Sequence, residues 1–489
     1  MTDSFRRRLS PLAALLLVAL GAAGCAINPA TGRQQLALIS PQQEAAIGAQ
    51  EFPRMVEQFD GVYPDTRLAA YVERIGRSVA VTTETPGAPF RFAVLNSELP
   101  NAFALPGGYV SVTRGLLALA NDEAELAGVL AHEVAHVTAR HSAERYSQST
   151  LAQLGIGVLG AATGSQELAQ AVGAGAQLYL LSYSRDQESE ADTIGIRYMT
   201  NAGYDPQAMS SFLAQLDRSE RLDGLIDGGS TGGTVPGYLR SHPRTADRVR
   251  QAAAVAAQAA GRSSRRNRDA YFDMIDGMVW GESGNNGFVR GTTLAHPNLG
   301  FLWRAPDGFS LEHSGERVIG SGPGEARIIF DTAAPQRRGP AIAYLTDEWA
   351  RNRTLAGLER IDVNGFEAAT GTFQAPTDAG TRDIRVVAIR LAADRFARFI
   401  FLTPPQRTAQ MAPALQRTTF SFRPMTRSES QAYGPLRIDV VPVRRGDTVT
   451  SLARRMAFDG HQVERFLALN GLDRGAALQA GERVKLIVE

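Results

Sequence analysis

The chain has 489 residues and a formal net charge of +1, and 44% of its residues are hydrophobic and 21% charged. A chain of this length normally divides into about three domains, and this hydrophobic fraction is sufficient to form their cores. The near-balance of charge argues against a nucleic-acid-binding protein, which normally carries a clear excess of basic residues.

The first 25 residues have the pattern of a secretory signal. Three arginines at 6–8 precede a short apolar run at 9–20, and small residues then lead to Cys25, the only cysteine in the chain. The apolar run is too short for a comfortable membrane span. The stretch before Cys25 resembles the bacterial lipobox, in which the cysteine is lipidated and becomes the first residue of the mature protein, although Ala22 replaces the usual leucine.

We therefore expect residues 1–25 to form a lipoprotein signal peptide and lipobox. A single unpaired cysteine would otherwise be a reactive liability in a secreted protein, which favours lipidation over an ordinary signal peptide. Because Ala26 follows the cysteine, and not the aspartate of inner-membrane retention, the outer membrane is the expected anchor site. The predicted location is the bacterial periplasm, with membrane attachment through a lipid on Cys25.

Residues 26–260 form one predicted domain that is mostly helical with a small sheet. Helices are expected to begin at Ser40, which precedes a proline, and at Asp65, and a strand is expected at 90–97. The stretch NAFALPGGYV at 101–110 predicts two short strands around a Gly-Gly turn. It is either an ordinary buried hairpin or a strand edge that can hold an extended substrate.

The stretch ELAGVLAHEVAHVTARH at 125–141 carries the clearest chemical signal. Asp122 is the expected N-cap of this helix. His132 and His136 are four residues apart, so their side chains lie on one helix face and can bind the same metal ion. Glu133 lies beside them and can act as a general base. The pattern therefore indicates a zinc hydrolase.

A third protein ligand is expected from a later helix that contains SRDQESEAD. Glu188 and Asp192 are also four residues apart, so one can bind the metal and the other can orient a ligand histidine. His141 is rejected as a ligand, because it lies five residues beyond His136, where its side chain would point about 140° away from that of His136.

Three segments, LAHEVAHVTARH, YSRDQESEADTIGIRYMTNAGYDP and SHPRTADR, resemble the HtpX/CAAX-prenyl-protease family of gluzincin metallopeptidases, over about residues 35–258. The resemblance implies that His132, His136 and Glu188 bind one Zn²⁺ per chain and that Glu133 is the general base. It also implies a supporting role for Asp192.

The family's downstream His-Pro element matches His242-Pro243. His242 is expected to approach the zinc or the developing oxyanion, either as a latch on the resting metal or as a donor in the transition state. A simple role in starting a helix is the alternative. Arg248 is a further candidate for assisting the site.

The chain differs from the integral-membrane members of that family. Its best candidate span, residues 151–181, contains Gln166, Glu167 and Gln170, so we expect helices buried in the domain. The chain is thus closer to the periplasmic lipoprotein branch, and misfolded or unassembled envelope proteins are better expected substrates than prenylated ones. The glycine-rich loop at 222–237 is either a mobile lid or a passive surface loop.

Residues 261–269 read as a polar, basic linker, and the strand-like stretches at 270–425 predict an accessory α+β domain with an antiparallel sheet. Asn364-Gly365 is a strong hairpin signal in this domain. His296 and His313 are expected to be structural or surface residues, because no catalytic pattern surrounds them.

Residues 436–489 resemble a LysM module through VRRGDTVTSLARRM, LALNGL and LQAGERVKL. The resemblance implies a βααβ module that contacts peptidoglycan, unless the module is degenerate and retained only for packing.

The predicted fold class is therefore an α+β multidomain chain. The predicted function is a zinc-dependent metalloendopeptidase of the cell envelope, which acts on protein substrates, possesses a lipid anchor and binds no nucleic acid. Two alternatives stay open: a non-catalytic wall-binding lipoprotein or chaperone with a peptidase scaffold, and an enzyme that cleaves peptidoglycan.

Overall fold

The computed structural model describes residues 25–148, 150, 183–226, 238, 242, 246–259, 261–284, 286–314, 317–378, 380–458 and 460–489. The predictions for the signal peptide before residue 25, for the apolar stretch at 151–181 and for the loop at 227–237 lie outside these residues. Residues 222–226 continue a helix. Among the described residues, no helix combines the length and the apolar character needed to cross a bilayer.

The chain divides into two compact units, one of which is interrupted in sequence. The first unit comprises residues 1–281 and 437–488, and the second comprises residues 282–436. The C-terminal module is thus part of the same unit as the peptidase-like region.

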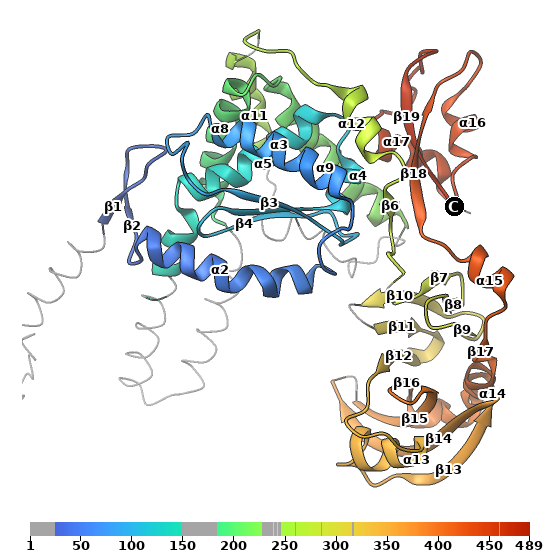
Figure 1. The fold of residues 1–489 in the computed structure, drawn as a ribbon. Helices are drawn as coiled ribbons and strands as arrows, with labels where there is room; N and C mark the ends of the chain where they lie inside the picture. Colours follow the sequence, from blue (N-terminus) through green and yellow to red (C-terminus); the bar gives the residue numbers. More distant parts are fainter. Residues whose placement is uncertain are drawn as a thin grey trace, which may run out of the picture. The chain divides into compact units, whose positions relative to one another are not determined.

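The first unit is built mainly of helices around a small sheet (Figure 1). Its elements before the second unit are β1 Cys25–Ile27, β2 Gln34–Leu36, α2 Pro41–Gln58, α3 Thr66–Ala80, β3 Arg91–Leu95, β4 Ala102–Leu105, β5 Tyr109–Thr113, α4 Arg114–Leu119, α5 Glu123–Thr138, α8 Arg185–Asn201, α9 Gln207–Ile226, α11 Ala246–Ala259, α12 Arg268–Ile275 and β6 Val279–Trp280. Its C-terminal elements are β18 Leu436–Pro442, α16 Val449–Ala453, α17 Gln462–Asn470 and β19 Arg483–Val488.

Capping residues define where these helices begin, as the sequence predicted. Ser40 forms a reciprocal capping box with Gln43 at the start of α2, and the Asp65 side chain accepts a hydrogen bond from the Leu68 backbone at the start of α3. Asp122 caps α5 in the same way through the backbone nitrogen of Glu125.

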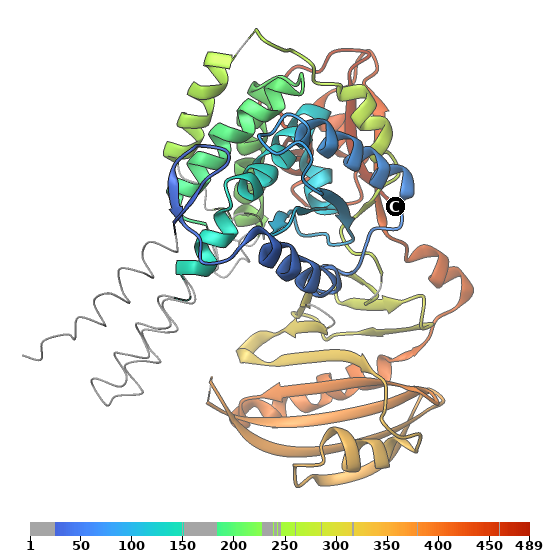
Figure 2. The ribbon, with the colours of Figure 1, turned by 60° about the vertical axis from the view of Figure 1, so that its left-hand side comes forward.

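The small sheet has the order β3-β5-β4, with β3 parallel and β4 antiparallel to β5, so β4 is an edge strand. Helix α2 lies along one face of this sheet and α5 along the other (Figure 1 and Figure 2). Phe59, the C-cap of α2, packs against Phe103 with ring centroids 5.2 Å apart, whereas Ala102 and Ala104 are buried on the opposite side. The alternation along β4 therefore fixes which face turns towards α5.

The C-terminal module is joined to the first unit by a sheet and by a buried lysine. Strand β18 is the central strand of the sheet β19-β18-β6, in which β6 comes from the peptidase-like region. The Lys485 side chain is fully buried, and its Nζ donates to the carbonyl oxygens of Ala118, Leu119 and Ala120 at 2.7, 3.4 and 2.8 Å. Ala118 and Leu119 are the last two residues of α4 and Ala120 is its C-cap, so the Lys485 side chain caps the end of that helix.

The second unit contains two antiparallel sheets, with the strand orders β10-β11-β12-β16-β15-β14-β13 and β17-β9-β8-β7. Its elements are β7 Phe288–Arg290, β8 Thr293–His296, β9 Phe301–Arg304, β10 Ser310–Ser314, β11 Arg317–Ser321, η1 Pro323–Glu325, β12 Arg327–Ala333, α13 Ala341–Ala343, η2 Tyr344–Trp349, β13 Ala356–Val363, β14 Phe366–Thr377, β15 Gly380–Ala392, β16 Arg395–Thr403, α14 Pro405–Ser421, β17 Arg423–Pro424 and α15 Arg427–Ala432.

The expected α+β multidomain class is confirmed, with a mostly helical region around a small sheet and a later antiparallel region. Asn364 and Gly365 have φ angles of 51° and 89° and form the tight turn between β13 and β14. The expected domain boundaries stay a prediction.

Candidate metal centre

The centre forms where helices α5 and α8 approach each other closely. Gly195 of α8 lies against the backbone of α5, and a Cβ atom there would lie 3.0 Å from the backbone nitrogen of His132. A larger residue would crowd this contact and separate the helices. The two pairs with i, i+4 spacing, His132 with His136 and Glu188 with Asp192, are therefore brought to one place.

Four buried side chains converge there: His132, His136, Glu188 and His242. Each offers one ligand atom, and these atoms all lie within 4.8 Å of one another. The Nε2 atoms of His132 and His136 are 3.0 Å apart, and they lie 3.5 and 3.4 Å from the carboxylate oxygens of Glu188.

These distances fit a metal ion bound by ligands in a tetrahedral arrangement. Ligands bound to zinc at about 2.0–2.1 Å are separated by about 3.3 Å from one another in a tetrahedral site. The donor set of two imidazoles and a carboxylate is also one that zinc takes in hydrolases. The residues present therefore fit a zinc ion.

Electrostatics keep the centre ready for a cation. Burial alone would raise the pKa of Glu188, but the neighbouring histidines outweigh it and hold that pKa well below the usual range. Burial lowers the pKa of His136 well below its ordinary value, so this imidazole is neutral. A neutral imidazole and an ionised carboxylate are the protonation states that metal binding requires.

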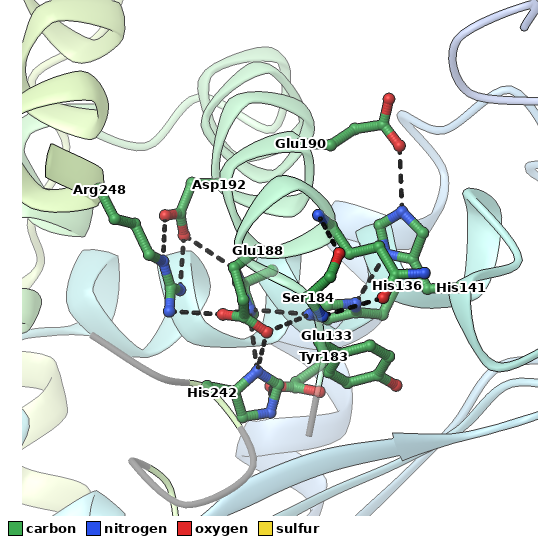
Figure 3. Close-up of polar contacts among 12 residues, drawn as sticks. Glu133, His136, His141, Tyr183, Ser184, Glu188, Glu190, Asp192, His242 and Arg248 are labelled. Carbon is green, nitrogen blue, oxygen red and sulfur yellow. Dashed lines mark hydrogen bonds and ion pairs between the residues drawn. The ribbon is translucent and has the colours of Figure 1, made fainter. Parts of the chain in front are cut away.

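A second layer orients His132. The Nδ1 atom of His132 lies 2.9 Å from Oδ1 of Asp192, and Arg248 forms two hydrogen bonds to the Asp192 carboxylate (Figure 3). Arg248 also pairs with the carboxylate of Glu188. Asp192 thus accepts a hydrogen bond from Nδ1 of His132, and Nε2 of the same ring faces the centre.

His242 completes the group from a different part of the chain. Its Nδ1 atom lies 2.8 Å from Glu188 Oε1 and 3.3 Å from His132 Nε2. The ring of Tyr238 stacks on that of His242, with centroids 4.6 Å apart. The Tyr238 backbone nitrogen donates to the carbonyl oxygen of Pro100, just before the edge strand β4.

Glu133 is fully buried beside the centre. Neither carboxylate oxygen has a hydrogen-bond partner among the described residues, and Nε2 of His242 lies 3.5 Å from Glu133 Oε1. Burial raises the pKa of Glu133 above its ordinary value. A buried carboxyl group with unused oxygens and a raised pKa is poised to exchange protons with a small molecule in the site.

Two contributors to the centre, Tyr183 and Arg145, were not predicted from the sequence. The ring of Tyr183 stacks on that of His136, with ring centroids 3.7 Å apart. The guanidinium group of Arg145 lies over the Tyr183 ring, 3.8 Å from its centroid. His141 was expected to point away from His136, and this expectation is wrong, because Nδ1 of His141 lies 2.8 Å from Nδ1 of His136. Helix α5 ends at Thr138, so the assumption of a continuous helix fails.

The remaining candidates lie elsewhere. Cys25 begins strand β1. His296 is buried, and His313 lies 3.0 Å from a carboxylate oxygen of Glu282. Neither histidine belongs to a group that could hold a metal in the part of the chain that the structure describes.

Comparison with known proteins identifies two domains. Residues 66–256 match Peptidase family M48, and residues 442–486 match the LysM domain. The chain therefore carries an M48 peptidase domain and a LysM domain, and both resemblances inferred from the motifs are confirmed.

Named relatives align with the peptidase region. The beta-barrel assembly-enhancing protease of Yersinia pestis is 37% identical over 202 residues, which are 40% of this chain and 41% of that protein. The protein of the same name from Escherichia coli K12 is 34% identical over 173 residues, covering 33% and 36%. Mitochondrial metalloendopeptidase OMA1 of Schizosaccharomyces pombe is 30% identical over 196 residues, covering 39% and 57%. The chain thus spans less than two thirds of each relative.

Proposed function

We propose that the chain is a zinc-dependent metalloendopeptidase of the bacterial cell envelope that hydrolyses peptide bonds of misfolded or unassembled envelope proteins. The observation that carries this proposal is the buried group of His132, His136 and Glu188, with the Glu133 carboxyl group beside it that has no hydrogen-bond partner among the described residues. The M48 match and the protease names of the relatives support the same reaction class.

In this proposal His132, His136 and Glu188 hold one zinc ion, and Asp192 orients His132. When bound, zinc supplies a Lewis acid that acidifies water and polarises a peptide carbonyl. Glu133 takes the proton from the attacking water and later gives it to the departing amine. The surrounding burial strengthens these electrostatic interactions, because the local dielectric constant is low.

The outer edge of the edge strand β4 is a suitable place for the substrate backbone. Among the described residues this strand pairs with β5 on one side only, and its face opposite α2 lies against the metal-bearing helix α5. An extended peptide could add to this edge through backbone hydrogen bonds, which do not depend on side-chain identity. Such binding suits unfolded substrates of varied sequence.

His242 occupies the place where a catalytic zinc site keeps an open position. Its distances to Glu188 and His132 match those between the other ligand atoms. This geometry favours a latch that closes the resting site, and the alternative is a donor that stabilises the oxyanion after the ring moves.

The test uses the chain from residue 26 onward, together with the variants Glu133→Gln and His242→Ala. We expect one equivalent of zinc, hydrolysis of casein by the unsubstituted chain, and loss of hydrolysis with retained zinc in Glu133→Gln. A gain of activity in His242→Ala supports the latch, and a loss supports the donor. Zinc without hydrolysis in every variant would favour a non-catalytic scaffold. Cleavage of purified cell wall in place of casein would favour a peptidoglycan hydrolase.

We further propose that a lipid on Cys25 anchors the chain to a membrane, most simply the outer membrane, and that the LysM domain contacts peptidoglycan. The lipobox-like sequence and the LysM match support these two proposals. A Cys25→Ala variant should lose incorporation of labelled palmitate and move to the soluble periplasmic fraction. Co-sedimentation of the unsubstituted chain with purified wall should report binding through the LysM domain.

A further inference from the structure

His141 lies behind the metal centre and contacts the side of His136 that faces away from the other ligand atoms. The Nδ1 atom of His136 is 2.8 Å from Nδ1 of His141, and Nε2 of His141 is 3.0 Å from Oε2 of Glu190 (Figure 3). Both histidines are about 1% exposed, whereas the Glu190 side chain is 24% exposed. The three side chains therefore form a line from the centre towards solvent.

The hydrogen-bond chemistry of this line allows one assignment of protons, which rests on the proposed function. If His136 binds zinc through Nε2, its Nδ1 must carry the proton, and this N–H donates to Nδ1 of His141. Nδ1 of His141 must then be unprotonated, so its proton is on Nε2. That N–H donates to the carboxylate of Glu190, which can only accept.

We propose that His141 and Glu190 are positioning residues that fix the tautomer and ring orientation of His136 and thereby set the zinc affinity of the centre. Histidine ligands usually donate their second N–H to a carboxylate, a carbonyl or water. Here a second histidine takes that place, and a carboxylate sets the tautomer of that histidine in turn.

The backbone is shaped to bring His141 into this position. Arg140 has a φ of 55°, in the left-handed region that non-glycine residues rarely adopt. Its guanidinium group is held by the buried Glu44 carboxylate, with Nε to Oε1 at 2.7 Å, and by the Ile39 carbonyl oxygen at 2.8 Å. These contacts stabilise the turn after α5 that directs the His141 ring back towards His136.

The centre thus has two different supports. His132 is oriented by Asp192, which Arg248 holds in the interior, whereas His136 is oriented by the buried His141 and, through it, by the partly exposed Glu190. Arg33, between β1 and β2, lies 3.7 Å from Glu190 and is 81% exposed. Only the second support is therefore accessible from outside the domain.

The test measures the zinc dissociation constant by competition with a chelator, together with the melting temperature of the metal-free chain. His141→Phe keeps a flat ring but has no hydrogen-bond acceptor, and His141→Asn restores an acceptor near the position of Nδ1. Glu190→Ala removes the terminal carboxylate. Asp186→Asn is the matched control, because Asp186 is an exposed carboxylate on the same helix.

We expect His141→Phe to weaken zinc binding about 10- to 100-fold, Glu190→Ala to weaken it less, and His141→Asn to recover most of the affinity. Asp186→Asn should bind zinc as the unsubstituted chain does. Equal zinc affinity in the unsubstituted chain, Glu190→Ala and the His141 variants would overturn the positioning role of His141 and Glu190 and leave the proposed function intact. An unsubstituted chain that binds no zinc would overturn both.

Discussion

Arg248 balances the negative charge of two carboxylates at the metal centre. Its guanidinium group pairs with both Asp192 and Glu188, and all three side chains are almost completely buried. Removing one partner of a buried ion pair leaves uncompensated charge, which typically costs about 3–5 kcal/mol. A zinc ion would supply positive charge to the same carboxylates.

We therefore expect Arg248→Met to lower the free energy of unfolding by about 3 kcal/mol in the presence of a chelator, and by clearly less with saturating zinc. Denaturant titration under the two conditions measures the difference. Arg250→Met, at an exposed position on the same helix α11, is the control. The same loss of stability with and without zinc would show that the charge balance is not what Arg248 contributes.

Arg140 lies in the turn after α5 and has a left-handed backbone conformation. Its left-handed backbone conformation costs about 1–2 kcal/mol for a residue with a Cβ atom, but its side chain is held by Glu44 and the Ile39 carbonyl oxygen. Glycine at this position would lose the side-chain contacts and also lose the backbone cost. Alanine would lose the contacts and keep the cost.

Both variants should destabilise the chain, and Arg140→Ala should be less stable than Arg140→Gly by about 1 kcal/mol. Thermal unfolding of the metal-free variants gives the comparison. If alanine proved as stable as glycine, residue 140 would not be in the left-handed conformation in solution.

At the scale of elements, the start of α5 contains a buried acid. Glu125 accepts hydrogen bonds from the Asn121 backbone nitrogen at 2.8 Å and from Ser211 Oγ at 2.6 Å. Burial and the nearby charge of Asp122 raise its pKa to about 7, although Lys485 opposes this shift. Because the pKa is higher in the folded chain than the ordinary value of 4.5, the folded chain binds the proton more tightly.

The stability that this proton contributes is complete below about pH 4 and is lost as the pH rises through about 7. A Glu125→Gln variant lacks this titration. Relative to the unsubstituted chain, its free energy of unfolding should therefore rise between pH 5 and pH 8, by up to about 3 kcal/mol. Denaturant titrations at both pH values, with chelator present, provide the test, and a pH-independent difference would contradict it.

Much of α5 and α8 was predictable from sequence because the evidence is local. The i, i+4 spacing placed His132 with His136 and Glu188 with Asp192, and polar caps marked where the helices begin. The position of His141 was not predictable in this way. It depends on Arg140 leaving the helix, and the contacts that stabilise this turn come from residues about 100 positions earlier in the chain.

The position of the C-terminal module was also not predictable, because it depends on contacts between residues far apart in the sequence. Its strands and helices were recognisable from local sequence, but nothing local indicates that β18 pairs with β6 or that Lys485 caps α4. A lysine in the closing strand of a small module ordinarily reads as a surface residue. Its complete burial is a property of the partner surface, which the sequence of the module does not contain.

At the scale of the whole molecule, the second unit is an insertion between two strands that belong together. The backbone nitrogen of Gly277 donates to the Ile438 carbonyl oxygen at 2.8 Å, and Ile438 donates in return to Met278 at 2.9 Å. The chain therefore leaves the first unit and re-enters it at neighbouring points. Insertions with adjacent ends can commonly be removed without unfolding the parent domain.

We expect excision of residues 282–436, with Gly281 joined to Arg437 by a short Gly/Ser linker, to leave zinc binding unchanged and the first unit folded. Removal of residues 437–489 should instead strongly lower the free energy of unfolding of the first unit. That deletion removes the central strand of β19-β18-β6 and leaves three carbonyl groups at 118–120 without their buried donor. Each unsatisfied buried group costs about 1–3 kcal/mol.

The substitution Lys485→Met separates the capping role from the rest of the deletion. Methionine preserves much of the apolar stem but offers no donor, so the free energy of unfolding should fall by about 3 kcal/mol or more. Denaturant titration of the excised chain with and without this substitution isolates the first unit from the second. If Lys485→Met and the 437–489 deletion both left its unfolding midpoint unchanged, the module would be a separate appendage.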